Sequence, residues 1–219
     1  MPLTRRHQSI IEICTNCKGR LSHLQQALPT WIKQQHTAPF AITVLDYNCP
    51  DNTAAWLLAN LTEPITALTY RSPSPWYSQC HAHNLCARDS TADVLVFIDA
   101  DNLLAPDWLP TAVDDILANK ADYSETFWTE GSPNRGTCAV RRSLLTKIRG
   151  WDEALHGYGD KDRDLYIRLS KHGRKSVWDI TKLTTISHPD ADRVRYAPDP
   201  DREASTKLNA IISATRGES

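Results

Sequence analysis

Two aspartates separated by one residue follow a strongly apolar run near the middle of the chain. The run is VLVFI at residues 94–98, and Asp99 and Asp101 come directly after it. Such a run predicts a strand buried on both faces, and open α/β sheets bind ligands beyond the carboxyl ends of their strands. Two carboxylates in one tight turn can both approach a divalent cation, and such a cation neutralises the charge of a nucleotide diphosphate. The pattern therefore predicts cation and phosphate binding beyond this strand.

A simpler interpretation of this turn is that its polar residues reverse the chain and cap the helix that begins after Pro106. Two later features favour binding. His188 ends a later predicted strand, and the glycine-rich segments 150–153 and 157–159 supply aromatic and acidic side chains. Taken alone, His188 would be interpreted as a buried, hydrogen-bonded histidine. Together with the aspartate pair it becomes a candidate cation ligand.

The elements that must position these residues alternate between short apolar runs and helical patterns in the first half of the chain. This alternation predicts an α/β fold with a mostly parallel central sheet flanked by helices. The expected strands are residues 9–14, 40–46, 65–70 and 94–98, and the expected helices are 21–31, 50–58, 79–88 and 106–117.

The second half of the chain is less regular. Its pattern predicts a strand at 137–140, a helix at 143–148, a glycine-rich turn at 150–159 and a helix at 162–172. Two short strands at 176–178 and 183–186, a charged and proline-rich loop at 190–203, and a last helix at 204–214 follow. Asp162 thus stands at the beginning of a predicted helix.

Composition limits the classes of partner. The chain has 219 residues, with 25 Lys and Arg against 26 Asp and Glu, which gives a formal charge of -1. Bulk attraction to nucleic acid or anionic lipid is therefore not expected. No apolar stretch approaches the length of a membrane span, so we expect no stable membrane insertion. These observations predict a soluble, cytoplasmic protein whose six cysteines are free thiols.

Two Cys/His clusters have spacings that a zinc site can use. They are Cys14-x-x-Cys17 and the segment that runs from Cys80 through two histidines to Cys86. Packing of these thiols as small hydrophobic groups is the favoured interpretation, because Cys14 ends an apolar run and the paired-knuckle spacing of structural zinc sites is missing. A non-catalytic zinc or carbohydrate-binding module stays as one alternative function.

Several segments, in sequence order, resemble the motifs of GT-A fold glycosyltransferases, particularly family-2 enzymes and those with a galactosyltransferase-type C-terminal motif. The resemblance covers most of the chain, from Ser9 to His188. Its segments are ICTNCKGR, the second-strand acid in VLDYN, HAHNLCAR, the Asp-x-Asp motif in FIDADN, GWDEALHGYGDKDRDLYIRL and the late histidine. Their shared order makes the set far more specific than any one motif.

The resemblance implies a metal-dependent, inverting glycosyltransferase that moves a sugar from a UDP-sugar to an acceptor hydroxyl. It implies Mn²⁺ or Mg²⁺ held by Asp99, Asp101 and His188, and a histidine ligand favours Mn²⁺. It also implies that Asp162 is the general base. The implied nucleotide contacts are Thr15, Asn16, Arg20, Asp46, Asn84 and Asp99, and the implied sugar or acceptor contacts are Trp151, Asp152, Glu153, Tyr158 and Gly159.

One departure from the family pattern lies beside the implied base. Lys161 replaces the glutamate that usually precedes Asp162, so the charge at this position is reversed. The change puts acceptor recognition in question, and Asp160 or Asp164 is a candidate to share the role of base with Asp162.

Two further departures lie on the nucleotide side. His83 stands where the family commonly has an arginine, which predicts a weaker or pH-dependent contact with the diphosphate. Cys14 and Cys17 replace the small or hydroxyl residues that are commoner in the first loop.

One catalytic domain is expected, with a nucleotide-binding half at 1–102, an acceptor and sugar half at 103–189, and a C-terminal loop and helix at 190–219. A nucleotidyltransferase is the nearest enzymatic alternative, although such enzymes usually have a glycine-rich phosphate loop and residues 15–20 contain one glycine. The sequence leaves the acceptor open among a glycan, a lipid-linked precursor, a protein and a small molecule. The near-neutral charge disfavours modified DNA.

Overall fold

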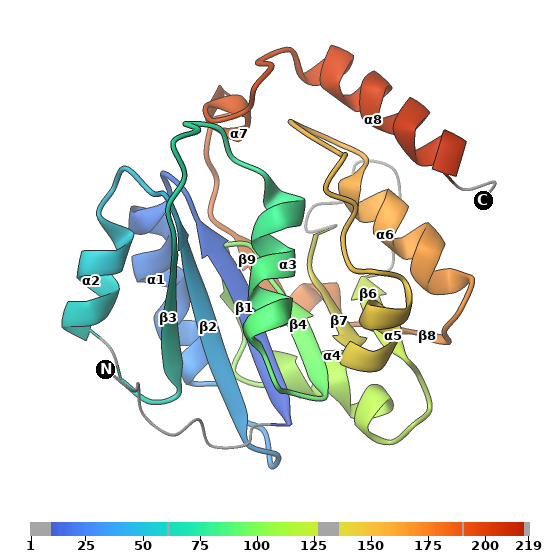
Figure 1. Cartoon of the computed structure of the whole chain (residues 1–219). Helices are drawn as coiled ribbons and strands as arrows, with labels where there is room; N and C mark the ends of the chain where they lie inside the picture. The colour runs from blue at the N-terminus through green and yellow to red at the C-terminus, as the bar shows by residue number, and fades with distance from the viewer. Residues whose placement is uncertain (1–9, 61, 127–135, 190, 217–219) are drawn as a thin grey trace.

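The computed structural model describes residues 10–60, 62–126, 136–189 and 191–216 (Figure 1). Residue 9, the first of the predicted opening strand, and residue 190, the first of the predicted loop, lie outside these ranges. Within them, no helix combines the length and the apolar character that crossing a membrane requires.

A seven-stranded sheet forms the middle of the molecule, in the order β3-β2-β1-β4-β7-β6-β8. β1 (Ile11–Cys17), β2 (Phe40–Tyr47), β3 (Ile65–Tyr70) and β4 (Val94–Phe97) are parallel neighbours. β7 (Cys138–Arg141) runs antiparallel to β4 and to β6 (Tyr123–Thr126), and β8 (Lys175–Trp178) is parallel to β6. Only β7 therefore opposes the common direction in this described sheet, which confirms the predicted α/β class.

Helices cover both faces of the sheet, as Figure 1 shows. One face packs against α1 (Leu21–Ile32), α2 (Thr53–Asn60) and α4 (Trp108–Leu117). The other packs against α3 (Gln79–Asp89), α5 (Arg142–Lys147) and α6 (Lys161–Ser170). β4 is apolar throughout because it is covered twice: Val94 and Val96 enter the first layer, and Leu95 and Phe97 enter the second. Complete burial of each such side chain contributes roughly 1.5–3 kcal/mol.

The first strand is longer than predicted. β1 extends past residue 14 to Cys17, because residues 15–17 continue the parallel pairing with β2. Side chains alternate along a strand, so Cys14 lies in the core under α3 while Cys17 lies in the core under α1. These two thiols cannot share a zinc ion. Across the described ranges, no group of three or more His, Cys, Asp or Glu side chains is arranged to hold a metal by itself.

Four elements differ from the sequence prediction: two strands and a short helix were not predicted, and the last helix begins earlier. β6 was not predicted, and β5 (Asn102–Leu104) pairs antiparallel with β9 (Leu183–Thr185), beyond the short 3-10 turn Ile180–Lys182. The segment 190–203 was predicted as loop, which is wrong, because α7 (Ala191–Val194) lies inside it. The last helix, α8 (Arg202–Arg216), begins earlier than residue 204, because Asp201 caps it through the amides of Glu203 and Ala204 at 2.9 and 3.0 Å. In Figure 1, α7 and α8 (red) lie across the top of the molecule.

Candidate active site

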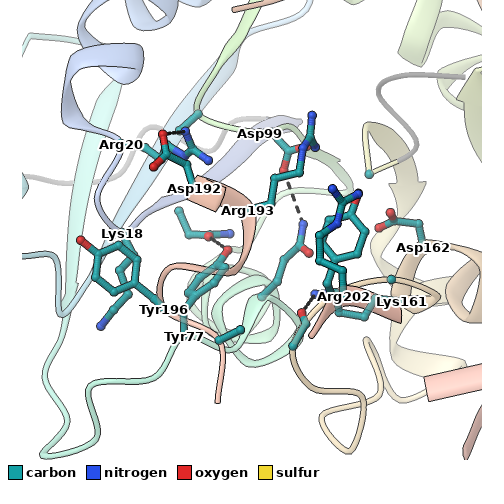
Figure 2. Close-up of a pocket in the computed structure, with 18 of the residues that line it drawn as sticks. Lys18, Arg20, Tyr77, Asp99, Lys161, Asp162, Asp192, Arg193, Tyr196 and Arg202 are labelled. Carbon is teal, nitrogen blue, oxygen red and sulfur yellow. Dashed lines mark hydrogen bonds and ion pairs between the residues drawn. The ribbon is translucent and has the colours of Figure 1, made fainter. Parts of the chain in front are cut away.

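A cavity of about 700 Å³ opens beyond the carboxyl ends of β1 and β4 (Figure 2). Its walls come from these strand ends, from the beginning of α6 and from the C-terminal segment. The acidic side chains that line it are Asp99, Asp101, Asp160, Asp162 and Asp192, and the basic ones are Lys18, Arg20, Lys161, His188, Arg193 and Arg202. Such a mixed lining suits a ligand that carries phosphate charge together with a cation.

Asp101 and His188 form a direct pair in this cavity. Asp101 lies in the turn between β4 and β5, and His188 follows β9, so the β5–β9 pairing brings the two segments together. The Ile186 amide donates to the Asp101 carbonyl at 2.8 Å, which fixes the approach. The Nε2 atom of His188 lies 3.1 Å from Oδ2 of Asp101. The pairing of two distant segments that the sequence analysis suggested is therefore present.

The Nδ1 atom of His188 has two neighbours of opposite character. Arg20 Nη2, which can only donate, lies 3.3 Å away, and the Pro189 carbonyl, which can only accept, lies 3.2 Å away. With Nδ1 accepting from Arg20, Nε2–H donates to Asp101. With Nδ1–H donating to Pro189, Nε2 presents a lone pair toward the Asp101 carboxylate. The second tautomer is the one that can bind a cation.

Asp99 lines the cavity together with Asp101 and Asp162, and the charges of both act on it. Its Oδ1 accepts from Gln79 Nε2 at 3.4 Å. Burial, with the nearby carboxylates of Asp101 and Asp162, raises the pKa of Asp99 to about 7. A Cβ atom on Gly136 would lie 3.4 Å from a carboxylate oxygen of both Asp99 and Asp162, so glycine keeps the space between them open. Burial and the two neighbouring carboxylates therefore disfavour the ionised form of Asp99.

Asp99→Asn is expected to stabilise the metal-free protein at high pH. The raised pKa means that Asp99 stabilises the fold below its unfolded pKa of about 3.9, and that this contribution is lost as the pH rises through about 7. The variant removes that loss. We expect a gain of the order of 1 kcal/mol at pH 8 in chelator-containing buffer and almost none at pH 4, measured by urea unfolding. A gain that is equal at the two pH values would contradict the raised pKa.

Asp162 lines the cavity from the first turn of α6, and the structure separates it from its two alternatives. Asp164 is buried, binds Arg168 at 2.6 Å and accepts from Ser213 Oγ at 3.1 Å, so its carboxylate is committed to holding α6 against α8. Asp160 also lines the cavity, but it sits at the helix N-cap with φ of 62° and pairs with Arg163 at 3.5 Å. Asp162 is the better placed of the three for chemistry.

Lys161, the charge reversal, also lines the cavity (Figure 2). Its Nζ donates to the Gly157 carbonyl at 2.5 Å. Burial lowers the pKa of Lys161, while the charges of Asp162 and Asp99 act in the opposite direction. The lysine therefore offsets part of the negative charge that the aspartates place here.

The predicted nucleotide contacts separate into two groups. Asn16 and Arg20 line the cavity, together with Lys18. Thr15 is buried and does not line it. Asp46 is also buried outside the lining, where it accepts from the Cys49 and Ala54 amides at 2.8 and 2.7 Å and pairs with Arg71 at 2.8 Å.

Asn84 lies outside the cavity lining as well. It exchanges two hydrogen bonds of 2.9 Å with the backbone of Trp151 and donates to Glu153 at 2.8 Å. In this structure Asp46 and Asn84 organise the loops around the cavity, and their contact with a nucleotide stays a prediction.

The end of the glycine-rich turn lines the cavity, and its beginning does not. Tyr158 and Gly159 line the cavity. Trp151 is 2% exposed and stacks on the ring of His83 with 4.6 Å between centroids, so it packs in the core. Asp152 Oδ1 accepts from the Ala154 amide at 2.9 Å. The structure thus does not bring Trp151, Asp152 and Glu153 together with Tyr158 on one wall.

His83 does not have the environment of a pH-dependent phosphate contact. Its side chain is buried beside Phe97 and Trp151, away from the cavity lining. Burial lowers the pKa of His83 to about 3, so the ring is neutral at physiological pH. Its Nδ1 lies 3.3 Å from Asn16 Nδ2, and Tyr77 donates to the other end of that amide. His83 therefore holds Asn16 in place.

The C-terminal segment supplies a wall that the sequence patterns did not identify. Asp192 lies 3.7 Å from Arg20, and Arg193, Tyr196 and Arg202 also face the cavity (Figure 2). A Cβ atom on Gly19 would collide with the Tyr196 ring, so the glycine lets this ring cover the β1 end. A cluster of arginine and tyrosine in a proline-rich segment was the available signal.

α8 fixes the glycine-rich turn from outside. Asn209 is 1% exposed, its Nδ2 donates to the carbonyls of His156, Tyr158 and Gly159 at 2.7, 3.2 and 3.0 Å, and its Oδ1 accepts from the His156 amide at 3.1 Å. Ser205 adds a hydrogen bond from the Tyr158 amide at 2.8 Å. The C-terminal helix therefore sets the shape of the cavity.

Asn209→Ala is expected to destabilise the protein by about 1–3 kcal/mol, because it leaves buried backbone groups of the turn without their partner. Chemical unfolding with two probes would measure the change. Lys207→Ala is the matched control, because its exposed pair with Glu203 lies on the same helix and contributes less than about 1 kcal/mol. Equal stability of the two variants would show that α8 does not hold the turn.

A family model described as glycosyl transferase family 2 matches residues 9–165. Two solved structures are similar in fold. TarS residues 1-349 from S. aureus, in complex with UDP-GlcNAc, is 14% identical with a TM-score of 0.69, over 92% of this chain and 65% of that one. The mannosyltransferase PcManGT from Pyrobaculum calidifontis, in complex with GDP-Man and Mn²⁺, is 14% identical with a TM-score of 0.67, over 96% of this chain and 74% of that one.

This chain spans less than two thirds of the length of the TarS chain. A comparison with curated proteins found no match. The family match covers well over half of the sequence, and it includes the Asp99–Asp101 turn and the beginning of α6, which meet at the cavity. Together with the sheet order and the two helical layers, it establishes that the chain belongs to glycosyl transferase family 2 and has the GT-A fold.

Proposed function

We propose that the cavity binds a UDP-sugar with a divalent cation and that the enzyme transfers the sugar to an acceptor hydroxyl with inversion. The observation that carries this proposal is the 3.1 Å approach of His188 Nε2 to Asp101 Oδ2 in the cavity beyond the β4 end. The nucleotide-binding half at 1–102, the acceptor half at 103–189 and the C-terminal wall at 190–219 remain part of the proposal.

The proposed metal ligands, a carboxylate and an imidazole, suit a transition-metal ion. An imidazole nitrogen and a carboxylate oxygen lie 3.1 Å apart at the cavity, and Mn²⁺ accepts both ligand types while Mg²⁺ prefers oxygen alone. The charges of Asp101 and Asp162 both act on Asp99, so three carboxylates lie near one another in the cavity, which supports a cation among them. We propose that Asp101 and His188 hold the ion, with Asp99 reaching the ion or the donor ribose. When bound, the ion would offset the negative charge that develops on the diphosphate as its bond to the sugar breaks.

Other residues that line the cavity are proposed to bind the nucleotide and the sugar. Asn16, Lys18 and Arg20 face the cavity from the β1 end, where the two cations can bind phosphate oxygens. Tyr158 presents an aromatic ring that can pack against a sugar face. These positions support a nucleoside diphosphate near β1 and a sugar near the glycine-rich turn.

Asp162 is the proposed general base. Its place in the first turn of α6 favours the ionised carboxylate, because the helix N-terminus is positive, and Lys161 lies beside it. Asp162 accepts the proton of the acceptor hydroxyl as the oxygen attacks the anomeric carbon. An attack opposite the departing diphosphate gives inversion.

The two solved neighbours support the donor class, because one is a complex with UDP-GlcNAc and the other a complex with GDP-Man and Mn²⁺. The family match sets aside the nucleotidyltransferase and zinc-module alternatives. The acceptor stays open beyond its hydroxyl group.

The test is a thermal-shift screen of UDP-sugars and GDP-sugars, each with Mn²⁺, with Mg²⁺ and with chelator. A ligand that binds only the folded state raises its melting temperature, by RT ln(1 + [L]/Kd) in free energy. We expect a UDP-sugar to raise it strongly with Mn²⁺, less with Mg²⁺ and least with chelator. A shift that is the same with and without metal would contradict the cation-dependent part of the proposal, and the absence of any nucleotide-sugar shift would contradict the donor.

A further inference from the structure

Two cysteine sulfurs meet beside the cavity without taking part in the proposed reaction. Cys17 is the last residue of β1, and Cys49 lies in the turn between β2 and α2. Because Cys17 is the register partner of Asp46, the parallel pairing brings this turn beside the end of β1. The two Sγ atoms are 4.0 Å apart.

The sulfur of Cys49 is surrounded by hydrogen-bond donors. The Gly19 amide and the Thr53 hydroxyl each donate to it at 3.1 Å, and the Cys17 thiol lies on a further side. Lys18 and Tyr196 interact electrostatically with Cys49 from the β1 end and the C-terminal segment. On the β2 side the Asp46 carboxylate accepts from the Cys49 amide at 2.8 Å. Such an environment stabilises a thiolate. In agreement, the Cys17 thiol, the Thr53 hydroxyl and backbone amides lower the pKa of Cys49 to about 6, against burial, which raises it.

Exposure distinguishes Cys49 from the other thiols. All six cysteines are free, and Cys49 is the one that is not buried. Cys17 is buried below it, with its pKa raised by its hydrogen bond to Cys49 and by burial, so it stays a thiol. The arrangement places an accessible thiolate in front of a protonated thiol, the order found in peroxide-reactive cysteine pairs in general.

We propose that Cys17 and Cys49 form a redox-active pair that a hydroperoxide converts to a disulfide. The Cys49 thiolate attacks one oxygen of hydrogen peroxide, the O–O bond breaks, and the products are a Cys49 sulfenic acid and hydroxide, which takes a proton to become water. The Cys17 sulfur then attacks the Cys49 sulfur, an S–S bond forms, and the S–O bond breaks. The departing hydroxide takes the Cys17 proton and leaves as a second water. Two thiols lose two electrons and the peroxide gains them.

The disulfide would alter the nucleotide side of the cavity. The two sulfurs must close from 4.0 Å to about 2.05 Å, which changes the position of Cys17 or Cys49 relative to the Gly19 amide and the Thr53 hydroxyl. Lys18 Nζ donates to the Asn48 carbonyl at 3.2 Å, so movement of this turn reaches a residue that lines the cavity. We therefore expect oxidation to weaken UDP binding, a consequence that rests on the proposed function.

Mass spectrometry of the whole protein tests the pair without reference to activity. After treatment with hydrogen peroxide, non-reducing peptide mapping should show a crosslink between the peptides of Cys17 and Cys49, and dithiothreitol should reverse it. Cys17→Ser should instead give a Cys49 sulfenic acid that dimedone traps, and Cys49→Ser should give neither product. Cys138→Ser, which removes a buried thiol elsewhere, should leave the crosslink unchanged. Peroxide treatment of the wild type that yields no Cys17–Cys49 crosslink overturns the proposal.

Alkylation of the reduced protein gives a second measurement that does not depend on closing the disulfide. The rate of Cys49 labelling by iodoacetamide should have its midpoint near pH 6, and Thr53→Val, which removes a donor, should move it upward. A wild-type midpoint above pH 8 would overturn the proposal. UDP-induced thermal shifts of the reduced and oxidised forms are then compared. If the reduced form shows no shift, the proposed function fails. The peptide crosslink still tests, independently of UDP binding, whether Cys17 and Cys49 form a disulfide.

Discussion

Asp162→Asn is expected to lower sugar transfer by roughly 10²- to 10⁴-fold, the usual contribution of a general base. The side chain lines the cavity in the first turn of α6, and asparagine keeps its size while removing its basicity. Donor binding should stay close to that of the wild type, because the proposed cation ligands are unchanged. Transfer is measured as UDP release under saturating donor, and binding as the Mn²⁺-dependent thermal shift.

Asp160→Asn is the matched control for this experiment. It makes the same substitution two positions earlier, in the same cavity, and asparagine tolerates the positive φ of 62° at this position. Its transfer rate should stay within a few fold of the wild type. If Asp160→Asn loses transfer and Asp162→Asn keeps it, the base assignment is wrong. Asp164 needs no such comparison, because its carboxylate is bound by Arg168 and Ser213 inside the protein.

Asp101→Asn is expected to abolish the metal dependence of nucleotide binding and to reduce transfer by at least about 10²-fold. The variant removes one charged oxygen ligand and leaves His188 opposite a neutral amide, so the site loses the carboxylate that pairs with the imidazole to hold a cation. The measurement is a UDP thermal shift at increasing Mn²⁺ concentration. In the wild type the shift should rise to a plateau, and in the variant it should stay at the chelator value.

Asp192→Asn provides the comparison for general electrostatic effects. Asp192 lies on α7 in the same cavity, 3.7 Å from Arg20, and it is not one of the side chains proposed to hold the ion. This variant should keep the Mn²⁺-dependent shift. An Asp101→Asn protein that retains the shift would show that the ion binds elsewhere, and loss in both variants would show that the cavity responds to net charge alone.

The part of the fold that the sequence predicts well is the part built from local patterns. β2 and β3 begin and end within a residue of their expected limits, and α1 and α4 follow their apolar stripes closely. In each of these elements, apolar residues recur at the spacing of a helix or a strand. The residues that will be buried can therefore be recognised from a short stretch of sequence. The Asp99–Asp101 turn was placed correctly for the same reason, because it directly follows a run that is buried on both faces.

The elements that the sequence did not predict depend on distant partners. β6 is four residues long and entirely buried although three of its residues are polar, because β7 and β8 pair with it on either side. α7 is a single short turn of helix between prolines and charges, and its composition favours a loop. Asn209 and Ser205 are ordinary polar residues of an exposed helix by pattern, and only the docking of α8 on the glycine-rich turn gives them their role.

Among the site residues, motif position alone did not distinguish residues that face the cavity from residues that support it. Asn16, Arg20, Asp99, Asp101, Asp162 and His188 face the cavity. The same motifs also include Asp46, Asn84 and Trp151. These side chains contact neighbouring parts of the protein instead of the cavity. Backbone groups in those loops need partners, and such hydrogen bonds cannot be read from residue types in sequence.

A crystal structure of the protein with UDP and Mn²⁺, with data collected to record the anomalous signal of manganese, tests the central claim most directly. The account predicts one strong anomalous peak in contact with Asp101 and His188 Nε2 and with the diphosphate of a UDP whose base lies toward the β1 end. A manganese peak away from these two side chains, or UDP bound outside this cavity, would contradict it.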